Sequence, residues 1–116
     1  MDVLEQRLKT KIWVQAYLRR TEADGFSATL VRRGDADAGA VLIKVNRLCN
    51  GCSVYTQVRD ENGDPAWFSG TGKDAVSEDV AEAYVARQKQ YDADLWVVEV
   101  EDPKSAYWLD GKILES

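Results

Sequence analysis

The chain has 116 residues, 45% hydrophobic and 30% charged, so we expect residues 1–116 to form a single globular domain with its own core. Its formal net charge of −5 repels phosphate backbones, which disfavours a nucleic-acid partner unless basic residues cluster locally. The sequence contains no histidine, which excludes Ser-His-Asp and Cys-His catalysis and imidazole metal ligation.

The first predicted element is a helix over Lys11–Asp24. Thr10 is suited to its N-cap, and Gly25 to the position after its end. Apolar residues recur there with helical spacing, at Ile12, Trp13, Ala16 and Tyr17. The same stretch also alternates as Ile12, Val14, Ala16 and Leu18, so the start of a strand is an alternative.

Four strands are predicted next, separated by short segments rich in turn-forming residues. Their ranges are Ser27–Arg33, Gly39–Leu48, Cys52–Asp60 and Pro65–Ser69. Asn-Gly between two apolar runs is a strong signal of a tight β-hairpin, so Asn50 and Gly51 are expected to form the turn between the second and third strands. Connections this short favour a four-stranded antiparallel meander.

A second helix is predicted over Glu78–Tyr91, with Ser77 as its N-cap. Leu95–Glu101 is predicted to be a strand, and Ala106–Leu109 a last short strand. This order predicts an α+β fold with a single mainly antiparallel sheet, built from the four-stranded meander and one or two C-terminal strands. Both helices are expected to pack on one face of that sheet.

Four stretches carry a family resemblance: Lys11–Val14, Tyr17–Arg20, Arg32–Val41 and Asp94–Asp102. They resemble landmarks of the domain of unknown function 1491 family, whose members are short alphaproteobacterial proteins. The resemblance covers nearly the whole chain, and Arg32–Val41 is its most specific part. It implies no activity and no cofactor. In that family the position of Cys49 is commonly aspartate, so the resemblance argues against a shared metal or redox role there.

Cys49 and Cys52 flank the predicted Asn-Gly turn with the spacing of two zinc ligands. A zinc site needs two further ligands, which Asp, Glu or a second copy of the chain would have to supply, because the sequence has no other cysteine and no histidine. Three interpretations stay open: a reduced pair beside a turn, a disulfide, and a metal shared between subunits. A cytosolic setting and the hairpin context favour the reduced pair.

Two arginine doublets, Arg19–Arg20 and Arg32–Arg33, stand out in this acidic chain. Guanidinium groups suit carboxylate and phosphate ligands, so Arg20, Arg32 and Arg33 are candidates for binding an anionic small molecule. The alternative is that these arginines pair with nearby acidic residues on a solvated surface.

Trp67 and Trp108 stand beside predicted turns and are the tryptophans most suited to exposure. An exposed tryptophan near an arginine is typical of a protein-interaction hot spot, which makes both residues candidates for an interface. The alternative for each is a place in the core, because a small core needs large side chains.

The apolar runs have the length of strands, and Met1–Lys9 lacks the apolar centre of a secretory signal. We therefore expect a cytoplasmic protein without a membrane partner. Its expected function is non-catalytic binding or protein interaction, without a cofactor and through one sheet face or a strand edge. The partner would be a second copy of the chain or another protein. The alternative is an enzyme or ligand-binding protein with an arginine-lined site for an anionic small molecule.

Overall fold

The computed structural model describes residues 9–106 and 112–114. Within these ranges the chain forms two α-helices, six strands and a short 3-10 turn, η2. In chain order they are α1 (Thr10–Ala23), β1 (Ser27–Arg32), β2 (Val41–Asn46), η2 (Leu48–Asn50), β3 (Cys52–Arg59), β4 (Pro65–Ser69), α2 (Glu78–Tyr91), β5 (Trp96–Glu101) and β6 (Lys112–Leu114). Every helix in these ranges is too short or too polar to cross a lipid bilayer.

The six strands form one mixed sheet with the order β1-β5-β2-β3-β4-β6. Three of its neighbouring pairs are antiparallel, namely β1–β5, β2–β3 and β3–β4. The pairs β2–β5 and β4–β6 are parallel. The predicted α+β fold with a mainly antiparallel sheet is therefore confirmed.

The predicted four-stranded meander is wrong, because β5 lies between β1 and β2. Only β2, β3 and β4 form a continuous antiparallel meander. The reason is that β5 is apolar on both faces and is buried from Trp96 to Val98, as a central strand must be. The eight residues between β1 and β2 (33–40) are enough to pass the end of a strand lying between them.

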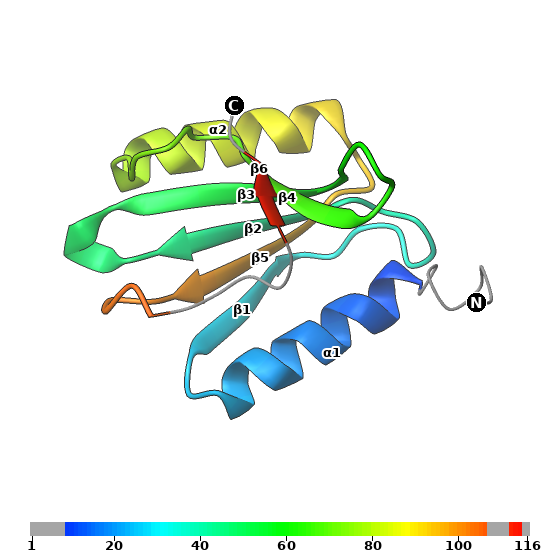
Figure 1. Ribbon diagram of the computed structural model, residues 1–116, viewed down its shortest axis with the longest axis horizontal. Helices are drawn as coiled ribbons and strands as arrows, with labels where there is room; N and C mark the ends of the chain where they lie inside the picture. The colour runs from blue at the N-terminus through cyan, green and yellow to red at the C-terminus, as the bar shows by residue number, and fades with distance from the viewer. Residues whose placement is uncertain (1–8, 107–111, 115–116) are drawn as a thin grey trace.

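The two helices lie on opposite faces of the sheet, which corrects the expectation of one covered face (Figure 1). Residues of α1 pack with one set of strand side chains: Val14 and Tyr17 with Val41, Ile43, Val45, Trp96, Val98 and Val100. Residues of α2 pack with the other set: Ala81 and Val85 with Leu42, Val54 and Val97. Because β2 and β5 carry apolar side chains on both faces, each face needs a helix to cover it.

Both predicted helices are confirmed, and α1 is a helix rather than a strand. The Ser77 hydroxyl oxygen accepts a hydrogen bond of 3.2 Å from the backbone N–H of Val80, as predicted for the N-cap of α2. Gly25 follows α1 with a φ of +93°, a conformation that favours glycine. Thr10, in contrast, does not cap α1, because its hydroxyl donates a 2.9 Å hydrogen bond to the carbonyl of Gly39.

The connection between β2 and β3 is a five-residue loop (47–51), not the predicted two-residue turn. The side-chain oxygen of Asn46 accepts a 2.8 Å hydrogen bond from the N–H of Leu48, which turns the chain before the Asn-Gly pair. The backbone N–H of Arg47 then donates a 2.8 Å hydrogen bond to the carbonyl of Gly51, which closes the loop. The predicted strand Ala106–Leu109 falls mainly outside the described residues.

Candidate functional site

β1 lies at one edge of the sheet, and in the described part of the chain it pairs only with β5. Its side chains are largely exposed, with 38% of Leu30 and 46% of Val31 accessible. The register with β5 shifts between Leu30 and Arg32, so the regular part of the strand is Ser27–Leu30. An open edge presents backbone N–H and C=O groups to which another extended segment can add as a strand.

The two faces of this edge differ in chemistry. The cross-strand partners are Ser27 with Glu101, Ala28 with Val100, Thr29 with Glu99, and Leu30 with Val98. Val98 and Val100 belong to the core on the α1 side, so Ala28 and Leu30 face that side as well. Glu99 and Glu101 alternate with them and lie on the α2 side. The edge is therefore apolar towards α1 and polar to acidic towards α2.

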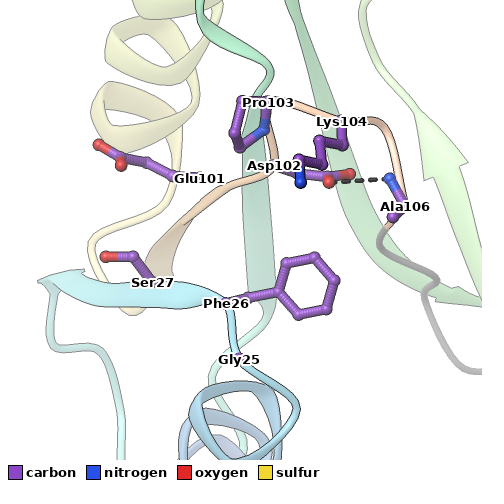
Figure 2. A pocket seen from close by; sticks show the side chains of 8 residues that line it. All are labelled: Gly25, Phe26, Ser27, Glu101, Asp102, Pro103, Lys104 and Ala106. Carbon is purple, nitrogen blue, oxygen red and sulfur yellow. Dashed lines mark hydrogen bonds between the residues drawn. The ribbon is translucent and has the colours of Figure 1, made fainter.

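A pocket of about 430 Å³ lies at the end of the sheet where β1 begins and β5 ends. Figure 2 shows Phe26 pointing into the space beneath the loop that follows β5. The lining residues are Gly25, Phe26, Ser27, Glu101, Asp102, Pro103, Lys104 and Ala106. The buried Asp102 side chain accepts a 2.8 Å hydrogen bond from the N–H of Ala106, which fixes the loop that forms one wall. The pocket thus combines an aromatic ring with a lysine and a glutamate.

The most unusual charged group in the described residues is Lys44, whose side chain in β2 is only 2% exposed. Its Nζ lies 3.0 Å from Glu78 Oε2, 3.2 Å from Glu82 Oε1 and 3.5 Å from Glu99 Oε1. The amide of Asn46 also donates to Glu78 at 3.1 Å and to Glu99 at 3.2 Å. This network joins the first turns of α2 to the neighbouring strands β2 and β5.

Burial by itself would lower the pKa of Lys44, but hydrogen bonds to Glu78 and Glu82 and the charge of Glu99 raise it above its ordinary value. The ammonium form is therefore held, and Lys44 is unsuited to act as a nucleophile or general base. Sequence reasoning missed this residue. The available signal is a lone lysine in an apolar run (41–45), together with two glutamates four positions apart at the start of a helix.

The two cysteines are both free and lie in different environments. Cys49 is exposed on η2, whereas Cys52 is buried beneath α2 in the core on that side. Burial raises the pKa of the Cys52 thiol, which keeps it protonated and unreactive. Among the described residues, no group of three or more His, Cys, Asp or Glu side chains could hold a metal ion.

The candidate arginines are not brought together on one ligand site. Arg20 lies in the last turn of α1, next to the start of β1, whereas Arg32 and Arg33 lie at the other end of that strand. The guanidinium of Arg32 donates to the carbonyls at the end of α2, at 3.2 Å to Asp92 and 3.0 Å to Ala93. Arg33 instead lies over the Trp96 ring, 5.7 Å from its centroid.

Of the two places considered for Trp67, an exposed interface and the core, the structure shows the core. Trp67 is 2% exposed and belongs to the core, where its ring centroid lies 5.9 Å from that of Trp13 on α1. Its position in β4 places it in the core on the α1 side, and the turn residues beside it in the sequence give no sign of that burial. Trp108 lies outside the described residues.

Comparisons with protein families and with solved structures point to the same family. The sequence profile of a family described as "Protein of unknown function (DUF1491)" matches residues 8–110. No curated protein matches the chain. The crystal structure of a DUF1491 family protein from Caulobacter crescentus CB15 is 36% identical, with a TM-score of 0.81, over 92% of this chain and 99% of that one.

Two structures determined in solution are similar as well. The NMR structure of a DUF1491 family protein from the same organism is 35% identical, with a TM-score of 0.78, over 94% of this chain and 98% of that one. The solution structure of protein Atu0922 from A. tumefaciens is 25% identical, with a TM-score of 0.70, over 83% of this chain and 86% of that one.

Proposed function

This chain belongs to the DUF1491 family, for which no function is described, and we propose that it is a non-catalytic protein-interaction domain. Its binding element would be the open edge of β1, to which an extended segment of a partner adds as a further strand. This mode of recognition derives affinity from backbone hydrogen bonds and specificity from side-chain pockets along the edge.

The observation that carries the proposal is the position of β1 at the end of the strand order, with Leu30 and Val31 exposed. Proteins usually protect a strand edge with charges, prolines or bulges, because an open edge attracts other chains. Here the shift beyond Leu30 protects only the end of the strand, and Ser27–Leu30 is left regular and uncharged. A regular, uncharged stretch of only four residues is suited to bind a single extended segment of a partner.

The pocket beside Phe26 supports the same function. Its lining includes Ser27, the first residue of the exposed edge, so the pocket lies at one end of that edge (Figure 2). Phe26 and Pro103 offer apolar contact, and Lys104 and Glu101 offer polar contact. The partner would therefore be selected by one side chain placed in this pocket.

The alternative function, an arginine-lined site for an anionic small molecule, draws no support from this geometry. Arg32 already donates to backbone carbonyls of α2, and Arg20 lies at the opposite end of β1. We assign the interaction to the cytosol, where two free thiols are expected to persist.

The proposal is tested by selecting a random peptide library against the purified chain and mapping the enriched peptides by backbone amide shifts in NMR spectra. The expected result is a response centred on Ser27–Leu30 and Phe26. Leu30→Arg should weaken binding, whereas Val80→Arg, which changes a residue 52% exposed on α2, should not. Failure to enrich any peptide, or enrichment of peptides that bind elsewhere, would contradict the proposal.

A further inference from the structure

We propose that the segment bound at β1 alternates basic and apolar residues, with its basic side chains on the α2 face. This inference rests on the proposed function and names the chemistry of the partner. The evidence is the difference between the two faces of the same edge, together with the charge of the neighbouring strand β5.

On the α2 face, the regular edge offers only small hydroxyl side chains. Ser27 and Thr29 are paired with Glu101 and Glu99 on β5. The carboxylate of Glu99 turns towards Lys44 and Asn46 on β2, whereas Glu101 is exposed beside Ser27. Adjacent strands are about 4.8 Å apart, so a strand added to β1 would lie about 10 Å from β5. Lysine and arginine are long enough to extend across a serine or threonine and approach a carboxylate at that separation.

The acidic character of this face extends beyond β5. Three carboxylates, from Glu78, Glu82 and Glu99, surround the single ammonium group of Lys44. More than half of the Glu78 and Glu82 side chains is exposed, so their charge is also presented to solvent. Arg32 also lies on this side, at the far end of β1, where it donates to carbonyls at the end of α2. The carboxylates of Glu78, Glu82, Glu99 and Glu101 still outnumber the cations of Lys44 and Arg32, so this region would favour a basic segment over an acidic one.

On the α1 face, the same edge requires apolar partners. Ala28 and Leu30 lie beside the core residues Val98 and Val100, and Leu30 is 38% exposed. Apolar side chains of an added strand would cover Leu30, while the residues between them point to the α2 face. Because side chains alternate along a strand, one segment satisfies both faces only if basic and apolar residues alternate.

A second copy of this chain matches these requirements poorly. Its own β1 would bring Ser27 and Thr29 to the α2 face, not lysine or arginine. Arg32 is the basic residue of that strand, and its guanidinium already donates to the carbonyls at the end of α2. Charge complementarity therefore favours a different, basic polypeptide over a homodimer built on this edge.

The test measures binding of three short peptides to the purified chain: one alternating lysine and valine, and two in which glutamate or threonine replaces lysine. We expect the lysine peptide to bind most tightly and to lose affinity as salt is added. Glu101→Lys should weaken it about tenfold, because an attraction that acts across β1 becomes a repulsion. Glu61→Lys, in the exposed turn between β3 and β4, changes the net charge equally and should have little effect.

The outcomes separate a failure of this inference from a failure of the proposed function. If the threonine or glutamate peptide binds at β1 as tightly as the lysine peptide, the basic partner is wrong and the binding edge still stands. If all binding peptides contact another surface, both proposals fail. A dimer that forms through β1 and excludes the lysine peptide would also overturn the basic partner, because a second copy would then be the occupant.

Discussion

The indole N–H of Trp96 donates a 2.7 Å hydrogen bond to the backbone carbonyl of Asp35. This bond joins the start of β5 to the loop between β1 and β2, and thus the two segments that carry much of the family resemblance. The carboxylate of Asp35 also accepts backbone hydrogen bonds from Asp37 and Ala38, at 3.2 and 2.9 Å. In the same loop, the carbonyls of residues 36 and 37 accept hydrogen bonds from the first turn of α1. Hydrogen bonds to β5 and to α1 therefore hold residues 35–37 of this loop in place.

Substitution of Gly39 should strongly destabilise the fold. A Cβ atom there would overlap the carbonyl oxygen of Asp94 and lie 2.9 Å from Cδ1 of Trp96. Gly39→Ala is expected to lower the free energy of unfolding by about 3 kcal/mol, the upper range for overpacking. Urea denaturation measures the change.

The control for this substitution is Gly63→Ala. Gly63 has a φ of +82° with open space around it, so it reports only the cost of a left-handed backbone, about 1 kcal/mol. If the two variants are equally stable, the tight packing of the loop against β5 is refuted.

Removal of the Lys44 charge should destabilise the protein by about 1–3 kcal/mol, less than for a fully buried pair because the carboxylates are partly exposed. Lys44→Met leaves Glu78, Glu82 and Glu99 to repel one another. Adding Glu82→Gln should recover part of the loss, which thermal unfolding can measure. Lys73→Met, in an exposed loop, is the matched control and should be nearly neutral.

The same network predicts a loss of stability in alkaline solution. Because the pKa of Lys44 is raised above 10.5, the folded chain binds this proton more tightly than the unfolded chain does. The stabilisation is complete below the unfolded pKa and disappears as the pH rises through the folded pKa. Urea unfolding from about pH 9 to about pH 11 should show a decline that Lys44→Met reduces. Identical declines in both proteins would exclude a role of Lys44.

The two thiols should differ sharply in reactivity. Exposed Cys49 should react promptly with a thiol-specific reagent, whereas buried Cys52, whose pKa is raised by burial, should react only after unfolding. Cys49→Ser should abolish the prompt reaction, which absorbance of the released chromophore reports. The absence of any prompt thiol in unreduced protein would indicate a disulfide or a bound metal.

Arg32 should contribute to stability through the end of α2. Arg32→Ala removes hydrogen bonds from a charged donor to the carbonyls of Asp92 and Ala93 and should cost about 1–2 kcal/mol at this partly buried site. Arg33→Ala, which removes only the contact with Trp96, should cost about 0.5–1 kcal/mol. If inorganic phosphate stabilises the wild-type chain but neither variant, these arginines form an anion site instead.

The helices and the approximate ranges of β1 to β5 follow from local sequence signals, whereas β6 at Lys112–Leu114 was not predicted. Ser77 and Gly25 mark helix ends because a cap and a positive φ require particular residues. The strand order does not follow, because insertion of β5 between β1 and β2 depends on which strands bury both faces. The two apolar faces of Val41–Ile43 and Trp96–Val98 are visible in the sequence, but they do not specify which strands become neighbours.

The candidate sites also combine features that local sequence predicts with features that depend on the arrangement of the strands and helices. Cys49 and Cys52 stand out by spacing, but their exposure depends on a five-residue loop (47–51) that begins directly after Asn46 and not at the Asn-Gly pair. Lys44 becomes conspicuous only when α2 and β5 bring three glutamates to it. The exposed edge at β1 is likewise a property of strand order, which local patterns do not encode.

Residue-resolved amide hydrogen exchange of β1, in the free chain and with a selected peptide bound, tests the central claim most directly. We predict that the outward-facing amides within Ser27–Leu30 exchange rapidly in the free protein and slow at least about tenfold in the complex, while amides of β3 stay unchanged. The claim is contradicted if every β1 amide is already protected in the free monomer, or if peptide binding protects another surface and leaves β1 unaffected.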